Sequence, residues 1–159
     1  MTPYLELAAT LAEEGQHTGA EVLWKYCVEE GTQDPSVIFN VGRMIQAQAK
    51  EPWRKAESLE WYERFITHPD ASLPDKSDAL QNIGCLMHQN GRPDKACIAF
   101  NLALQIEPEN KIARRNLAVA LEQCARFDEA DAEYVAILQK DWNDAGAHFS
   151  RGMIALLFG

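Results

Sequence analysis

Apolar and small residues recur along this chain with a period of 34. Within residues 77–110, large apolar side chains lie three or four residues apart, and a small residue accompanies them in each half of the segment. The positions that recur are Leu80, Ile83, Gly84, Met87, Gly91, Ala96, Phe100, Ala103 and Pro108. Spacings of three and four residues are typical of one helix face, so the segment predicts two amphipathic helices with a turn at Gly91.

The same positions are filled in other segments of the chain. Residues 1–34 show Leu7, Ala8, Leu11, Gly15, Ala20, Trp24 and Cys27, and residues 111–144 show Leu117, Ala118, Leu121, Ala125, Ala130, Tyr134 and Ile137. Residues 35–76 are longer than one period, and Tyr62 and Phe65 fit only if about four residues are inserted before Ser58 and the others near Pro69 to Pro74. Residues 145–159 restart a first helix. We therefore expect one array from residue 1 to residue 159.

The pattern predicts helices and no strand. Glycine and proline mark their ends, since glycine adopts the left-handed backbone after a helix and proline suits a first turn. The predicted helices lie near 3–14, 18–30, 35–49, 53–67, 77–90, 93–106, 111–124, 127–140 and 145–157. Positions are counted from the first residue of each repeat, which is residue 1, 35, 77 or 111. Small residues at positions 8 and 20 let two helices approach closely, while large residues fill the space between successive helix pairs.

This pattern resembles the tetratricopeptide repeat, a 34-residue helix pair of the form W-x2-L-G-x2-Y…A-x3-F…P. The resemblance implies an all-α fold, a right-handed superhelix of stacked antiparallel helix pairs. Each pair buries its apolar face against its neighbours, so stability comes from the interfaces between repeats. The resemblance also implies a non-catalytic scaffold that binds a protein or peptide in the concave groove of the stack.

Composition and charge narrow the function further. The chain is 47% hydrophobic and 25% charged, and its net charge of −9 argues against nucleic acid, which requires a basic face. Residues 1–34 carry seven acidic side chains and one basic side chain. The beginning of the chain lacks the basic flank and apolar run of a secretory signal, and no segment is apolar enough to cross a membrane. We therefore expect a cytoplasmic protein that does not act at a membrane.

Candidate catalytic and metal-binding groups are few. The cysteines, Cys27, Cys85, Cys97 and Cys124, lack C-x-x-C spacing and are interpreted as reduced, structural thiols. The histidines show no metal-ligand spacing, and His148 falls at an apolar repeat position that predicts a packed imidazole. No phosphate-binding loop is present. We expect no catalytic residue, no metal and no cofactor.

Candidate binding residues come from the family resemblance, in which positions 2, 5, 6, 9, 12 and 13 of each first helix line the groove. Position 6 is Asn40, Asn82 and Asn116 in three successive repeats, and Ser150 continues the series. Further groove candidates are Phe39, Gln81 and Gln89, together with Arg43 and Arg115, whose charge would favour acidic side chains or a carboxylate.

This column of amides resembles the asparagine ladder of O-GlcNAc transferases, which implies that each amide pairs with the backbone of an extended peptide. An asparagine here can also bridge to neighbouring backbone within the repeat, so both interpretations remain open. The lysine and asparagine combination of the two-carboxylate clamp in chaperone-binding members is missing, which disfavours a chaperone tail.

The end of the sequence suggests two further hypotheses. Residues 111–159 resemble the segment that joins such repeats to a glycosyltransferase domain in bacterial proteins, which implies a docking domain of a larger enzyme. Apolar residues occur on several faces of the last helix, and we expect Ile154, Leu157 and Phe158 to mediate self-association, for example a homodimer. A structural spacer that binds nothing is the remaining alternative.

Overall fold

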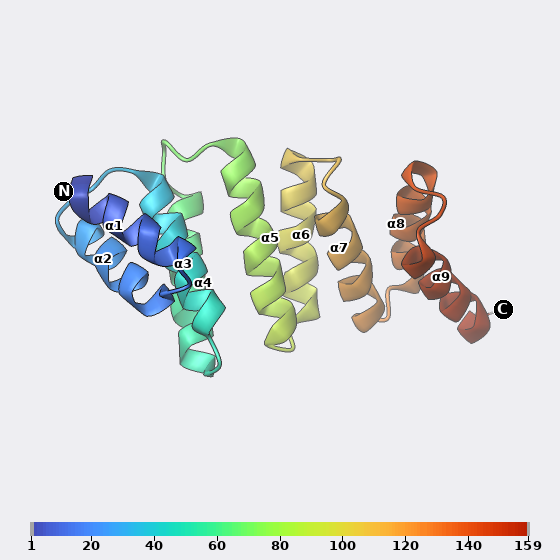
Figure 1. Ribbon diagram of the computed structural model, residues 1–159. Helices are drawn as coiled ribbons and strands as arrows, with labels where there is room; N and C mark the ends of the chain where they lie inside the picture. The colour runs from blue at the N-terminus through green and yellow to red at the C-terminus, as the bar shows by residue number, and fades with distance from the viewer. Residues whose placement is uncertain (1, 159) are drawn as a thin grey trace. The chain divides into compact units, whose positions relative to one another are not determined.

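The computed structural model describes residues 2–158, with side chains from residue 3 to residue 157. These residues form helices joined by short turns, and no strand occurs among them (Figure 1). The helices are α1 (Thr2–Glu13), α2 (His17–Glu29), α3 (Pro35–Gln48), α4 (Pro52–Ile66), α5 (Leu73–Gln89), α6 (Pro93–Ile106), α7 (Lys111–Gln123), α8 (Phe127–Lys140) and α9 (Ala145–Phe158). The all-α prediction is confirmed, and most helix ends fall within one or two residues of the predicted ones.

Helix α5 begins four residues earlier than the sequence pattern predicted. Ser72 provides the reason, because its Oγ accepts a hydrogen bond from the Asp75 backbone N–H at 3.3 Å and donates one to the Asp75 carboxylate at 2.6 Å. The first of these bonds caps the helix, because it satisfies a backbone donor that a helix start leaves free, and the second holds the Ser72 hydroxyl in place. Pro74 is compatible with the early start, since proline is tolerated in a first turn.

Left-handed backbone occurs after the first helices at Gly15 and Gly91, as predicted, and also after α2 at Gly31, with a φ of 88°, which was not predicted. Gly15 has a φ of 77° and Gly91 a φ of 69°, each directly after the first helix of a predicted repeat. Ala125 occupies the equivalent position after α7 and adopts a φ of 57°, an unusual angle for a residue with a Cβ atom. The repeat register also places a helix-ending glycine at Gly159, which lies outside the described residues.

The chain divides into two compact units, one up to Ala79 and one from Leu80 onwards. In the first unit, consecutive helices from α1 to α4 pack against one another. Tyr62 and Phe65 are at most 1% exposed, and the Tyr62 ring lies against Gly42. Ser58, which replaces the small alanine of other repeats, is fully buried and donates a hydrogen bond to the Gly42 carbonyl at 2.9 Å. These contacts support the register that requires an insertion before Ser58.

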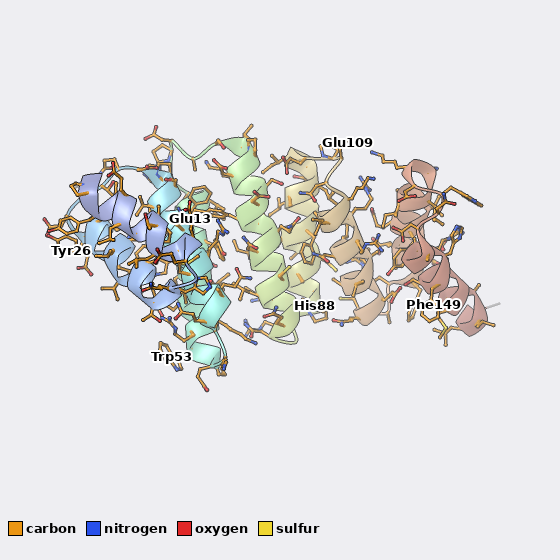
Figure 2. All side chains as sticks on the ribbon, in the orientation of Figure 1. Glu13, Tyr26, Trp53, His88, Glu109 and Phe149 are labelled. Atoms are coloured by element: carbon orange, nitrogen blue, oxygen red, sulfur yellow. The ribbon has the colours of Figure 1, made fainter. Side chains whose placement is uncertain are left out.

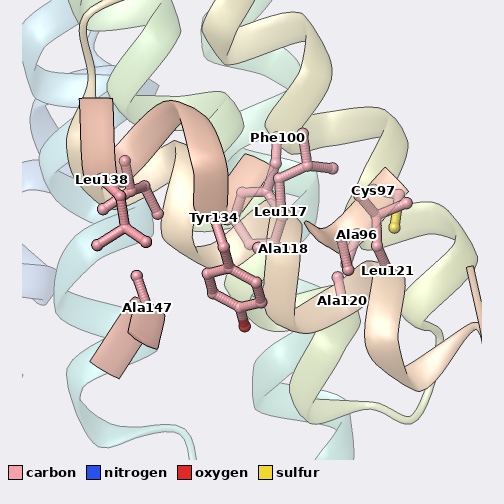
Figure 3. Packing of buried hydrophobic residues seen from close by; sticks show 12 residues of the cluster. Ala96, Cys97, Phe100, Leu117, Ala118, Ala120, Leu121, Tyr134, Leu138 and Ala147 are labelled. Atoms are coloured by element: carbon pink, nitrogen blue, oxygen red, sulfur yellow. The ribbon is translucent and has the colours of Figure 1, made fainter. Parts of the chain in front are cut away.

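In the second unit, the core forms where α6, α7, α8 and the start of α9 meet (Figure 3). Its large members are Phe100, Leu117, Leu121, Tyr134, Ile137 and Leu138, and alanines fill the close helix crossings. Phe100 packs directly on Gly84 of α5, where a Cβ atom would approach the ring to 2.5 Å. Position 8 of this repeat therefore has no room for any side chain.

A buried group of charges connects α2 to α4 in the first unit. Glu21 is 6% exposed and receives hydrogen bonds from Arg54 at 2.6 and 2.9 Å and from Lys25 at 2.7 Å. Glu57 completes the group with ion pairs to Lys25 at 2.6 Å and Arg54 at 2.9 Å. Burial alone would raise the pKa of Glu21, but the hydrogen bonds from Arg54 and Lys25 outweigh it and lower that pKa. Two acidic and two basic side chains thus compensate one another.

We predict that Gly84→Ala destabilises the second unit by about 1 to 3 kcal/mol, because the added methyl group must displace the buried Phe100 ring. Gly152→Ala is the matched control, since Gly152 holds the same repeat position in α9 and a Cβ atom there meets nothing within 4 Å. That substitution should stabilise by about 0.5 to 1 kcal/mol through helix propensity. Denaturant unfolding followed by far-UV circular dichroism measures both, and equal effects would contradict the packing described.

We also predict that Arg54→Met destabilises the first unit by about 2 to 4 kcal/mol, because it leaves Glu21 buried with Lys25 as its remaining cationic partner. Since the folded pKa of Glu21 is lowered, its contribution is fully present above the unfolded pKa and is lost as pH falls through the folded value. The penalty in Arg54→Met should therefore shrink in acid. Chemical unfolding at neutral and acidic pH measures it, with Arg64→Met as the control, and a penalty independent of pH would contradict this explanation.

Candidate functional site

The candidate site lies in the second unit, on the side of α5, α7 and α9 that carries the predicted groove residues. Asn82 of α5 and Asn116 of α7 occupy the same repeat position, and both are half-buried. The Asn116 amide donates to the Cys85 Sγ at 3.7 Å, a weak interaction that links α7 to α5. Among the described residues, no hydrogen bond engages the Asn82 side chain. Its donor and acceptor are therefore available to a ligand.

A small cavity lies beside Asn116. Its volume is about 110 Å³, and it is lined by Cys85, His88, Gln89, Phe100, Asn116 and Val119. The His88 Nε2 atom and the Gln81 Oε1 atom are buried without a hydrogen-bond partner among the described residues. Figure 2 labels His88 on α5. Gln81 is not among the lining residues, so the cavity combines apolar walls with one buried polar atom of unused hydrogen-bonding capacity, the His88 Nε2.

Ser150 is placed differently from the asparagines that precede it in the series. Its hydroxyl lies beside the phenol of Tyr134, and Glu122 of α7 adjoins the same phenol. Burial and the adjacent Glu122 carboxylate raise the pKa of Tyr134 to about 12, and the nearby Ser150 hydroxyl opposes this shift. The Tyr134 hydroxyl is nevertheless buried without a hydrogen-bond partner among the described residues, so Ser150 lies near this phenol without being paired to it.

Arg115 is paired within the chain. Its guanidinium forms a two-pronged interaction with the Asp144 carboxylate, one hydrogen bond of which is 3.3 Å long. This contact raises the pKa of Arg115 and lowers that of Asp144. Asp144 also accepts a hydrogen bond from the Ala147 N–H at 2.8 Å and so caps α9. The sequence predicted that Arg115 adds positive charge to the groove, but Asp144 neutralises that charge.

The groove candidates of the first unit form a separate group on α3. Phe39 packs against Tyr62 and Phe65, with ring centroids 5.7 and 5.1 Å apart, and Arg43 lies over its ring at 5.9 Å. Asn40 is half-buried, and no described residue hydrogen-bonds to its side chain. Phe39 thus contributes to packing, while a binding role for Asn40 and Arg43 stays a prediction.

Helix α9 carries an exposed apolar surface that the sequence interpretation described only in part. Phe149 is 70% exposed, Met153 45%, Leu156 82% and Leu157 64% (Phe149 is labelled in Figure 2). We call these four residues the α9 stripe. The first three lie at positions 5, 9 and 12 of their repeat, which are groove positions, so extending the repeat register would have identified them.

The three residues predicted for self-association differ in how they are placed in the structure. Ile154 packs against the core of the second unit, so it is not a surface residue for a partner. Leu157 is exposed and belongs to the α9 stripe. The side chain of Phe158 lies outside the described residues. Self-association through α9 remains a prediction.

The other chemical groups show no arrangement typical of a catalytic or metal site. The four cysteines are free thiols, and burial beside Cys124 raises the pKa of Cys97 to about 11. His148 is exposed and its ring contacts Trp142, which differs from the packed imidazole that was predicted. Within residues 2–158, no group of three or more metal-ligating side chains comes together. No helix in the same range is long and apolar enough to cross a bilayer.

Comparisons with known proteins agree with this architecture. The family model described as "Tetratricopeptide repeat" matches residues 77–110, which is the third predicted repeat. A curated relative, the TPR repeat-containing thioredoxin TTL4 of Arabidopsis thaliana, is 27% identical over 96 residues. The match covers 59% of this chain and 14% of TTL4, so this chain corresponds to a small part of that protein.

Solved structures share the fold over nearly the whole chain. MamA has a TM-score of 0.80 and 14% identity, covering 92% of this chain and 81% of its own. YrrB, described as a TPR protein with an unusual peptide-binding site, has a TM-score of 0.81 and 16% identity, covering 98% of this chain and 76% of its own. Identities this low establish the fold alone. Residues 77–110 therefore match the tetratricopeptide repeat, and the chain shares the fold of solved proteins that contain such repeats.

Proposed function

We propose that this chain is a non-catalytic interaction module whose second unit binds an extended peptide across α5, α7 and α9. The observation that carries the proposal is the pair Asn82 and Asn116, two half-buried amides at the same position of successive first helices. Tetratricopeptide-repeat arrays are stacks of helices that present extended binding surfaces. The peptide-binding description of YrrB, which has the same fold, supports the same class of ligand.

Helix spacing suits an extended ligand. Packed helices are on the order of 10 Å apart, and an extended chain advances about 3.3 Å per residue. Amides on neighbouring first helices could therefore meet every third residue of a peptide. An amide offers both a donor and an acceptor, which matches a peptide group whatever side chain it carries.

The internal bonding of the two asparagines favours a ligand role over a structural one. If they served mainly to bridge backbone within the repeat, both would have strong intramolecular partners. Asn82 has no such partner among the described residues, and Asn116 donates only to a thiol at 3.7 Å. Thiols are weak acceptors, so a peptide carbonyl would replace Cys85 at a net gain.

The proposal also includes a cellular setting and a partner class. The partner is a protein or peptide, since the net charge of −9 disfavours nucleic acid. The proposed location is the cytoplasm, an environment in which four free thiols remain reduced.

We predict that Asn82→Ala combined with Asn116→Ala weakens binding of a peptide selected on this chain from a random display library. Each lost hydrogen bond contributes a net of about 0.5 to 1.5 kcal/mol, so the double variant should bind roughly fivefold to a hundredfold more weakly. Fluorescence anisotropy with the labelled peptide measures the dissociation constant, and circular dichroism verifies that the helices remain.

Asn101→Ala is the matched control, because Asn101 is exposed on α6, outside the candidate groove. It should leave the affinity unchanged. If the double variant binds as tightly as the parent, the peptide does not use these amides and the proposed groove is wrong.

A further inference from the structure

We infer that the peptide carries two apolar anchor side chains, one entering the cavity between α5 and α7 and one lying on the α9 stripe. This inference rests on the proposed function and specifies its ligand: a segment without acidic residues whose anchors are about three to five residues apart, as the geometry below derives. The cavity, the α9 stripe and the charges around them all lie within the second unit.

The α9 stripe has the spacing of a binding surface on one helix face. Phe149, Met153 and Leu156 are four and three residues apart and therefore share one face. The opposite side of α9 is the packed one, since Ala147 is fully buried and Ile154 packs against the core. The exposed side chains thus belong to a helix already anchored by its other face.

The equivalent positions on the preceding first helices have a different chemistry. On α7 they are Arg115, Val119 and Glu122, and on α5 they are Gln81, Cys85 and His88. The groove face therefore changes from polar on α5 to apolar on α9. Contiguous exposed apolar surface of a few hundred Å² commonly marks an interaction site. A ligand that matches this gradient has its largest apolar side chain at the α9 end.

Charge around the α9 stripe argues against an acidic ligand. Arg115 is neutralised by Asp144, and Arg151 is held by Asp131 at 2.6 Å. Glu122 has no ion-pair partner among the described residues. The uncompensated groove charge next to the stripe is thus negative, so it repels acidic side chains and tolerates neutral or basic ones.

The cavity between α5 and α7 limits the size of the anchor side chain that enters it. Its volume of about 110 Å³ is bounded by the Phe100 ring and Val119 on the apolar side. Buried cavities of about 150 Å³ lined by apolar residues accommodate benzene, so this one fits a branched aliphatic side chain but not an indole. The unpaired Nε2 of His88 lies in the same lining and can bond to the peptide next to the anchor.

The helix geometry sets the distance between the anchors. The cavity lies between α5 and α7, whereas the α9 stripe is one to one and a half helix spacings further on, or roughly 10 to 15 Å. An extended peptide covers that distance in about three to five residues. The expected ligand therefore has an aliphatic residue, a short spacer and a second large apolar residue.

The test begins with a random peptide library displayed on phage and selected on the immobilised full chain. Enriched peptides should carry two apolar residues with the stated spacing and should lack acidic residues between them. Replacing either apolar residue by alanine in a synthetic copy should weaken binding by about tenfold or more, as expected of anchors that dominate an interface.

Variants of the chain test each anchor separately. Phe149→Ser with Leu156→Ser removes the most exposed part of the stripe, and Val119→Phe fills the cavity. Each should weaken binding by about tenfold. Matched controls lie on α6, where Ile98 is 62% and Leu102 41% exposed: Ile98→Ser with Leu102→Ser, and Ile98→Phe, should bind like the parent.

The outcomes separate this inference from the proposed function. Binding that depends on Asn82 and Asn116 but not on the stripe or the cavity overturns the two-anchor inference and leaves the proposed function intact. Binding that depends on none of these residues overturns both. Sedimentation showing that the purified chain dimerises, and that Phe149→Ser with Leu156→Ser makes it monomeric, assigns the stripe to a second copy and also overturns the inference.

Discussion

Close approach of two helices at a small residue, which is Gly42 or Gly84 in two repeats and Ala8 or Ala118 in the others, is the constraint on which each repeat depends. Gly84 allows the Phe100 ring to lie against the α5 backbone, and Gly42 does the same for Tyr62 in the first unit. Because a large ring fills the space that a Cβ atom would need, the two helices of a pair are held at one distance and one rotation. The groove-facing residues of the first helix are oriented by this contact, although they take no part in it.

The helices and their register could be predicted from the sequence because they depend on local spacing. Small and large residues at fixed positions define which faces pack, and glycine and proline mark the ends. Ser58 is predictable only in part. Its small side chain fits position 20 of the repeat, where other repeats have alanine, but the sequence does not show that its hydroxyl donates a hydrogen bond to the Gly42 carbonyl. The early start of α5 was missed for a similar reason, since Ser72 forms a cap that the repeat pattern does not contain.

The candidate site was less predictable because its character depends on contacts between distant residues. Arg115 and Asp144 are 29 residues apart, and no local pattern indicates that the second neutralises the first. The cavity arises from side chains of three helices, so its size depends on packing rather than on any motif. The α9 stripe is predictable from the sequence, since Phe149 and Met153 occupy groove positions of the repeat, whereas hydrophobicity alone points to Ile154, Leu157 and Phe158.

The unequal placement of tryptophan gives the two units different optical properties. The first unit carries Trp24, which is 5% exposed in its core, together with Trp53 and Trp61, whereas the second unit carries Trp142, which is 71% exposed. The second unit instead buries a tyrosine, Tyr134, whose emission is weak and readily transferred to tryptophan. Intrinsic fluorescence will therefore report chiefly on melting of the first unit. If the two units unfold at different denaturant concentrations, fluorescence and circular dichroism will give different midpoints, which is a sign of departure from two-state behaviour.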